Sequence, residues 1–227
     1  MIKIIQDFLP RPLFDYIKKV VENEKGMLWN FNPRNLQPQN KTKGSENYKL
    51  GKTLYVMPLL SSNGQEVYDT ELMPLFGIFQ QYMMEHMQDR CKDEKADGIG
   101  TKLARMKLNC YPSQERQIDH GIHTDILGNG RPDPNVVTSV FNFHTCNGYT
   151  TIFDKDKNGD YKKKVVVPSI ENSCVMFNNP HPHFGTTQND TQTRIVLNTN
   201  IFKTNIDPFS QEPDPKTGEI ERIDDYF

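Results

Sequence analysis

Five of the six histidines fall in one stretch of the C-terminal half, and two of them are placed to bind a metal ion. His123 and Asp125 are separated by one residue, so on an extended segment both side chains leave the same face. A second histidine from a distant strand would complete a set of two imidazoles and one carboxylate on one side of the ion. The remaining coordination positions would stay open for other ligands.

His181 and His183 compete for the third ligand position, because both lie in the segment 178–185. Pro180 and Pro182 hold this segment extended and rigid, which suits a ligand that must be placed accurately. His181 lies between the two prolines and is interpreted as a turn residue. His183 begins the next predicted strand and is preferred. The predicted set of His123, Asp125 and His183 is the arrangement expected of non-haem Fe(II) oxygenases.

Arg194 opens an otherwise apolar strand, and its charge requires a partner. An unpaired arginine pointing inward costs several kcal/mol, so we expect it to meet a carboxylate. An internal Asp or Glu is one candidate. A bound dicarboxylate is the other, because one end of it matches the guanidinium bidentately.

A competing metal signal is the segment 154–159 (Asp-Lys-Asp-Lys-Asn-Gly), which matches the first half of an EF-hand calcium loop. The twelfth position is Val165, which offers no carboxylate. Asn158-Gly159 is therefore interpreted as a type I′ hairpin turn. The three lysines that follow, Lys162, Lys163 and Lys164, are expected to form a solvated strand edge.

Short runs of β-branched and aromatic residues fill the chain from residue 102 onward, and helical spacing occurs only before that point. We predict helices at 12–23 and 70–91, a strand at 2–9, and a surface loop at 30–50 that could act as a lid. Further strands are predicted at 102–111, 117–125, 136–144, 149–153, 162–167, 173–177, 183–187 and 193–203. This pattern is typical of a β-sandwich or a jelly roll.

The fold class predicted is mainly β, a cupin-like double-stranded β-helix with N-terminal helices packed on one sheet. The 227 residues suit a single domain, with a supporting region at 1–100, a catalytic core at 101–205 and a C-terminal extension at 206–227. The four cysteines show no disulfide pattern, and no signal peptide or long apolar run occurs. We therefore expect a soluble, cytoplasmic protein without membrane association. A net charge of −2 tells against extended contact with nucleic acid.

The order His123-x-Asp125, His183 and then Arg194 resembles the Fe(II)- and 2-oxoglutarate-dependent dioxygenases, closest to the small prolyl-4-hydroxylase-like members of bacteria and phages. The segment 147–153 is similar to the Gly-x-Thr-x-Phe strand of that family. The segments 183–187 and 194–198 are similar to its closing strands. The resemblance covers about residues 105–202.

The resemblance implies that His123, Asp125 and His183 hold Fe(II), with 2-oxoglutarate as cosubstrate and O2 as oxidant. It implies that Arg194, Tyr111 and Asn109 bind the cosubstrate, although a polar strand end would explain the last two almost as well. The expected reaction is hydroxylation of an amino-acid side chain, prolyl among the candidates. A nucleobase oxygenase and a non-catalytic cupin-like metal-binding module are the alternatives. His120 and His144 stay unassigned.

Overall fold

The computed structural model describes residues 2–23, 29–32, 49–88, 100–128, 131–156 and 160–204. Its helices are α1 (Arg11–Glu22), α2 (Met73–Phe76) and α3 (Ile78–Gln88), with a 3-10 turn η2 (Pro58–Leu60). Its strands are β1 (Ile2–Ile5), β2 (Asn30–Asn32), β3 (Lys49–Val56), β4 (Val67–Tyr68), β5 (Gly100–Pro112), β6 (Leu127–Gly128), β7 (Arg131–Pro132), β8 (Val136–Asn142), β9 (Cys146–Lys155), β10 (Tyr161–Ser169), β11 (Ser173–Asn178), β12 (His183–Thr186) and β13 (Thr193–Thr204).

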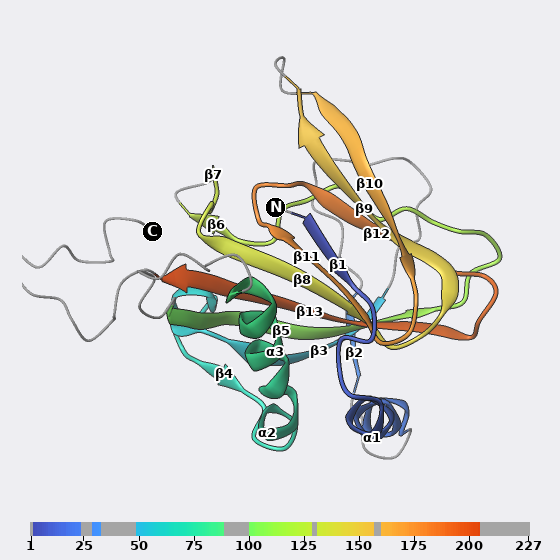
Figure 1. Ribbon diagram of the computed structural model, residues 1–227, viewed down its shortest axis with the longest axis horizontal. Helices are drawn as coiled ribbons and strands as arrows, with labels where there is room; N and C mark the ends of the chain where they lie inside the picture. The colour runs from blue at the N-terminus through green and yellow to red at the C-terminus, as the bar shows by residue number, and fades with distance from the viewer. Residues whose placement is uncertain are drawn as a thin grey trace, which may run out of the picture.

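The major sheet has the strand order β1-β11-β8-β13-β5-β3-β2, with β4 paired to β3. Its pairings are antiparallel. The helices lie together on one side of this sheet (Figure 1). α1 begins directly after Pro10, carries proline in its first turn, and buries Phe14, Ile17 and Val21. An apolar stripe on each helix therefore covers one face of the sheet.

Strand β5 separates two environments by the alternation of its side chains. Leu108 and Cys110 belong to the apolar core with the helices. Lys107, Asn109 and Tyr111 leave the opposite face and line a cavity. The long β13 pairs with β5 over its whole length, so its alternate residues continue the same cavity wall.

The minor sheet has the order β10-β9-β12 and is extended by a segment that makes only isolated bridges. Asp119 pairs with Thr186, and His123 pairs with His183. The hairpin of β9 and β10 projects away from the body of the molecule (Figure 1). Two antiparallel sheets with few helices confirm the predicted fold class, a double-stranded β-helix.

Two predicted elements are not continuous in the structure. The segment 117–125 is not a regular strand, because bonds such as the one from Ile118 N–H to the Thr187 hydroxyl interrupt its ladder. The helix predicted for 70–91 divides at Gly77 into α2 and α3, and its predicted end lies outside the described residues. Proline in the first turn of α2 and glycine at its end account for the break.

The N-terminal region contributes strands that the sequence pattern did not predict. β3 pairs with β5 along the cavity wall. β1 ends at Ile5, so the predicted strand 2–9 is too long. The ends of the predicted loop 30–50 lie in β2 and β3, whereas residues 33–48 and 206–227 lie outside the described part.

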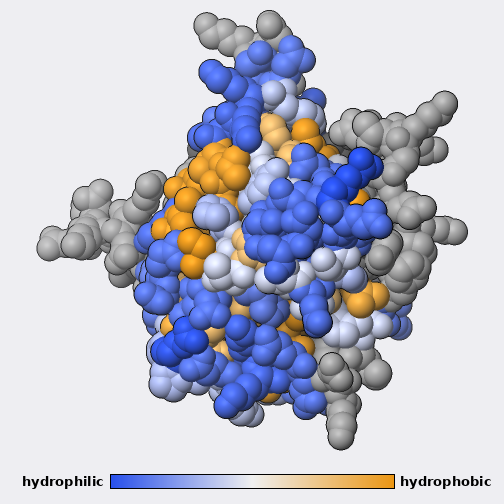
Figure 2. All heavy atoms as spheres, turned by 90° about the vertical axis from the view of Figure 1, so that its right-hand side faces the viewer, coloured by the Kyte–Doolittle hydropathy of each residue, from blue (hydrophilic) through white to orange (hydrophobic). Residues whose placement is uncertain are grey.

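The surface is mostly polar, in agreement with a mean hydropathy of −0.70. Figure 2 shows a largely hydrophilic face with a hydrophobic group at its upper left. No helix among the described residues is long and apolar enough to cross a membrane. The described cysteines, Cys110, Cys146 and Cys174, are free thiols, as predicted, and Cys91 lies outside the described residues.

Candidate active site

The structure brings His123, Asp125 and His183 together, with one ligand atom from each lying within 4.8 Å of the others. The Nε2 atoms of His123 and His183 lie 3.7 and 3.8 Å from the Asp125 carboxylate oxygens. Two backbone hydrogen bonds between His123 and His183, of 3.0 and 2.9 Å, place the two imidazoles side by side. The predicted three residues therefore form one candidate metal centre.

Both imidazoles are oriented by their surroundings. The Nδ1 of His123 lies 2.9 Å from the Gly121 carbonyl, which can only accept, so Nδ1 is the donor and Nε2, which faces Asp125, is the nitrogen available to a metal. His183 is buried with its ring 4.9 Å from that of Phe177. Burial lowers the pKa of His183 to about 4. It is therefore neutral at pH 7, which is the form that binds a metal.

Asp125 is held by three donors. The Arg105 guanidinium lies 2.8 Å from Oδ1, and the amides of Asn198 and Asn200 donate to Oδ2 at 3.1 and 2.9 Å. Burial alone would raise the pKa of this carboxyl, but Arg105, the two imidazoles and the Asn200 amide hold it well below its usual value. Asp125 is therefore ionised and fixed in position.

Arg105, Asn198 and Asn200 were not predicted as part of the site. The signal was present in the sequence, because Asn198 and Asn200 follow Arg194 at even spacing and so leave the same face of β13. Arg105 lies opposite Asn200 in the register of β5 and β13, and its Nε donates to the side-chain Oδ1 of Asn200 at 3.0 Å.

Arg194 is among the largest fully buried side chains, with 1 % of its surface exposed. Its guanidinium donates hydrogen bonds of 3.2–3.5 Å to three neutral oxygens. The acceptors are the Thr186 backbone carbonyl, Oδ1 of Asn142 and the Thr150 hydroxyl. Nε has no acceptor, and no described carboxylate pairs with the group. Burial lowers the pKa of Arg194. The internal acid expected as one alternative is therefore not found in the described part of the chain.

Two glycines shape the slot that Arg194 occupies. A Cβ on Gly148 would stand 2.7 Å from Cδ of Arg194 and 3.0 Å from the Thr186 carbonyl oxygen. A Cβ on Gly185 would stand 3.4 Å from Nη1 of Arg194. The absence of side chains at these positions gives the guanidinium its room. The sequence gives no sign of this, because the contacts are made across strands.

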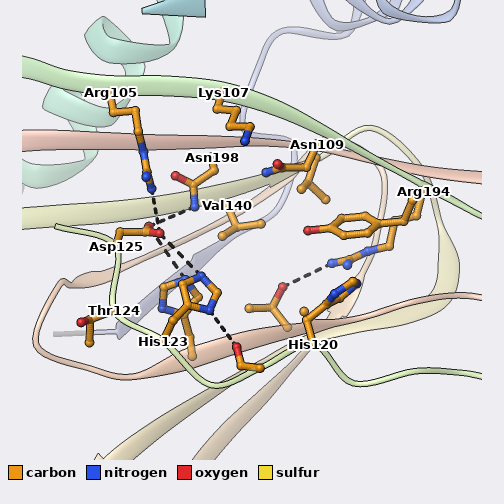
Figure 3. Close-up of a pocket in the computed structure, with 16 residues that line it drawn as sticks. Arg105, Lys107, Asn109, His120, His123, Thr124, Asp125, Val140, Arg194 and Asn198 are labelled. Atoms are coloured by element: carbon orange, nitrogen blue, oxygen red, sulfur yellow. Dashed lines mark hydrogen bonds and ion pairs between the residues drawn. The ribbon is translucent and has the colours of Figure 1, made fainter. Parts of the chain in front are cut away.

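The candidate metal centre and Arg194 share one cavity of about 180 Å³ (Figure 3). Asn109 and Tyr111, predicted to bind the cosubstrate, both line it. The guanidinium of Arg194 faces the ring of Tyr111, with the guanidinium carbon 5.6 Å from the ring centroid. His120 also lines the cavity, 5.0 Å from the Tyr111 ring centroid.

Two other histidines lie outside the centre. The Nδ1 of His181 lies 2.8 Å from the Asp154 carboxylate, and His181 is not part of the group formed by His123, Asp125 and His183. His144 lies 2.9 Å from Glu22 of α1. Asp154 of the calcium-like segment also pairs with Lys164, and residues 157–159 lie outside the described part.

The donor set fits Fe(II) and a small dicarboxylate. Two imidazoles and one ionised carboxylate form a three-point site with room on one side. The cavity is smaller than the roughly 300–1,000 Å³ typical of drug-sized ligands, so a small acid suits it. Arg194 supplies the buried cation that one carboxylate of such an acid would neutralise.

Comparison with solved structures gives many matches, and the three described here are 8–13 % identical to this chain. One is a 2OG-Fe(II) oxygenase family oxidoreductase from Burkholderia pseudomallei, with a TM-score of 0.61 and 8 % identity over 90 % of this chain and 86 % of that one. Another is a prolyl hydroxylase from Trichoplax adhaerens, in complex with a hypoxia inducible factor peptide, with a TM-score of 0.53 and 13 % identity over 89 % and 83 % of the two chains.

A third match is SnoN, a non-heme alpha ketoglutarate dependent epimerase from nogalamycin biosynthesis, with a TM-score of 0.52 and 12 % identity over 97 % of this chain and 88 % of that one. No family model and no curated protein matches the sequence. The resemblance predicted from the sequence is thus confirmed at the level of the fold.

Proposed function

We propose that this chain is an Fe(II)- and 2-oxoglutarate-dependent dioxygenase that hydroxylates an amino-acid side chain. One observation carries the proposal: the buried Arg194, without a carboxylate partner among the described residues, shares a cavity with the His123, Asp125 and His183 centre. A buried cation of this kind needs an anion to neutralise it. A dicarboxylic cosubstrate supplies one beside the metal.

His123, Asp125 and His183 would hold the iron, and Arg194 would bind the 5-carboxylate of 2-oxoglutarate. Burial raises the pKa of Tyr111, so its phenol stays protonated and can donate to the same carboxylate. Asn109 lies two residues before Tyr111 on β5, so its side chain leaves the same face, and it is assigned to the cosubstrate as well. When bound, the iron and 2-oxoglutarate together supply the reduction of O2, with oxidative decarboxylation to succinate and CO2.

The protein's own residues prepare the site for this chemistry. The apolar cluster beside the cavity, which includes Val140 and Val196, excludes water from one wall. Arg105, Asn198 and Asn200 keep the Asp125 carboxylate ionised and oriented. No large rearrangement of side chains is then needed when the metal binds.

A side chain, prolyl among the candidates, is preferred to a nucleobase as substrate. A net charge of −2 gives no general attraction to nucleic acid. The prolyl hydroxylase from Trichoplax adhaerens, which shares the fold, holds a peptide in its structure. A metal-binding module without catalysis would have no use for a buried arginine beside its ligands.

The test is an anaerobic titration with Fe(II), followed by 2-oxoglutarate. We expect a weak visible absorption band that requires both, and expect it to be lost in His183→Ala and Asp125→Ala. Absence of the band in the wild type, or its survival in either variant, would contradict the proposal. Succinate release with prolyl peptides, free amino acids and nucleosides then separates the substrate classes.

A further inference from the structure

Arg105 and Asn200 form a closed ring of hydrogen bonds with the Asp125 carboxylate. Nη2 of Arg105 lies 2.8 Å from Oδ1 of Asp125, and Nδ2 of Asn200 donates to Oδ2 at 2.9 Å. Nε of Arg105 donates to Oδ1 of Asn200 at 3.0 Å and closes the ring. Because a carboxylate only accepts and a guanidinium only donates, the Asn200 amide can be oriented in one way only.

The ring is anchored in the major sheet. Arg105 on β5 lies opposite Asn200 on β13, and Thr138 on β8 lies opposite Asn200 on the other side. The Thr138 hydroxyl is 3.0 Å from Nδ2 of Asn200. The guanidinium is thus held both by Asp125 and by an amide that is itself fixed. We therefore expect its charge to stay beside Asp125 when a metal ion binds.

The two oxygens of Asp125 are not equally occupied. Oδ2 accepts the amides of Asn198 and Asn200 at 3.1 and 2.9 Å, whereas Oδ1 accepts only the Arg105 guanidinium among the described side chains. A carboxylate oxygen offers about two lone-pair positions, so Oδ2 has none left and Oδ1 has one. Nε2 of His123 also faces Oδ1, at 3.7 Å. A metal ion is therefore expected to bind Oδ1, the oxygen that Arg105 already contacts.

A guanidinium on the same oxygen as the ion affects the two oxidation states of iron differently. Its charge repels Fe(III) more strongly than Fe(II), because the repulsion grows with the charge of each partner. The Asp125 side chain is only 3 % exposed, so solvent and salt screen this repulsion weakly. The position of Arg105 therefore favours Fe(II).

We propose that Arg105 is a positioning residue that stabilises Fe(II) against oxidation by sharing the metal-binding oxygen of Asp125. The inference rests on the proposed function, which supplies the identity of the metal. Iron oxidised to Fe(III) cannot supply the electrons that the reduction of O2 requires, so the reaction benefits from this preference. A purely structural Arg105 would only neutralise Asp125 in the unliganded protein, and its charge would not affect the Fe(III)/Fe(II) equilibrium.

The test measures the Fe(III)/Fe(II) equilibrium of the full chain loaded with iron, without O2 and without 2-oxoglutarate. Fe(II) passes one electron to ferricyanide, which gives Fe(III) and ferrocyanide, and the EPR signal of Fe(III) reports the oxidised fraction. Arg105→Gln keeps a hydrogen-bond donor and removes the charge. We expect its half-oxidation at a ferricyanide-to-ferrocyanide ratio about tenfold lower than in the wild type, a shift of about 59 mV.

Two further variants separate charge from geometry. Arg105→Lys keeps the charge and loses the planar fork, so its half-oxidation ratio should stay close to that of the wild type. Lys102→Met removes an exposed cation from the same strand and should also leave the ratio unchanged. Anaerobic Co(II) titration of each variant establishes that the metal centre is assembled. Arg105→Met gives a second neutral side chain and should show the same fall as Arg105→Gln.

An unchanged ratio in Arg105→Gln would overturn the proposal. An equal fall in Arg105→Gln and Arg105→Lys would also overturn it, because geometry and not charge would then set the equilibrium. Loss of Co(II) binding in both neutral variants would do the same and would make Arg105 a residue needed for assembly. These outcomes leave the proposed function standing, since that depends on the absorption band with 2-oxoglutarate. Failure of the wild type to bind Fe(II) would overturn both.

Discussion

Asn200 donates a 2.9 Å hydrogen bond to the Asp125 carboxylate. This bond connects a candidate metal ligand to β13, which pairs with β5 over its whole length in the major sheet. The same amide nitrogen also lies 3.0 Å from the Thr138 hydroxyl of β8. Asn198 reaches the same carboxylate oxygen from the same strand. The position of Asp125 is therefore set by strands that lie outside its own loop.

Asn200→Ala should weaken metal binding by about 10- to 100-fold, the usual cost of losing a partner that orients a ligand. The reason is that Asp125 loses a donor and Arg105 loses the acceptor for its Nε. Anaerobic Co(II) titration measures the effect. Asn135→Ala, at an exposed position away from the cavity, is the control. Equal Co(II) affinity in wild type and Asn200→Ala would show that the other donors suffice.

Alanine at the two glycines beside Arg194 should impair cosubstrate binding in a graded way. Gly148→Ala places a methyl group 2.7 Å from Cδ of Arg194, so the guanidinium must move. Gly185→Ala places one 3.4 Å from Nη1, so its effect should be smaller. Calorimetry with 2-oxoglutarate measures both, and metal affinity in the same samples should stay constant. The reverse order of effects would contradict this account of the slot.

Arg194→Met should stabilise the unliganded protein while abolishing its response to 2-oxoglutarate. Replacing even a buried ion pair with apolar groups of similar size is often neutral or stabilising by about 1–4 kcal/mol, and Arg194 has no carboxylate partner among the described residues to lose. In the wild type, ligand at 100 times Kd should add about 2.7 kcal/mol, or roughly 5–11 °C in Tm.

Thermal melts of the metal-loaded protein, with and without 2-oxoglutarate, test the Arg194 prediction. Arg116→Met removes an exposed arginine and should leave both melts unchanged. A ligand-induced rise in Tm that survives in Arg194→Met would show that the 5-carboxylate binds elsewhere.

His144 should contribute to acid sensitivity. Burial lowers the pKa of His144 below 6.5, and the hydrogen bond to Glu22 offsets this in part. The unfolded chain therefore takes up a proton before the folded chain does, and stability falls as pH decreases below about 6.5. The Nδ1 of His144 also accepts the Ile195 N–H, which requires an unprotonated nitrogen.

Urea unfolding of the unliganded protein between about pH 7.5 and 5.5, about one pH unit either side of the ordinary histidine pKa, measures this dependence. His144→Gln should show a shallower loss of stability, by at most about 1.4 kcal/mol per pH unit for one proton. Identical slopes in wild type and variant would show that other groups set the acid limit.

The metal centre could be predicted because its ligands follow a local rule. His123 and Asp125 need only an extended backbone, and the choice of His183 over His181 followed from two prolines. Burial of Arg194 followed from its apolar neighbours. The structure places all four residues around one cavity.

The surroundings of these residues could not be predicted in the same way. The contact between Gly148 and Arg194 depends on how two sheets pack, which no local pattern encodes. β3 was not predicted because the sequence that precedes it resembles a loop. It forms a strand because β5 offers it a pairing partner that is distant in the sequence. Asn198 and Asn200 are different, since strand alternation from Arg194 was sufficient to find them.

The paired backbones of His123 and His183 have a consequence for dynamics. The segment that carries His123 is joined to β12 by isolated bridges and separate hydrogen bonds, without a continuous strand ladder, so this edge can open locally. A metal held by both histidines would act as a cross-link between points 60 residues apart (183 minus 123) and would limit that opening. The amide protons of these two residues would then exchange with solvent more slowly once the ion is bound.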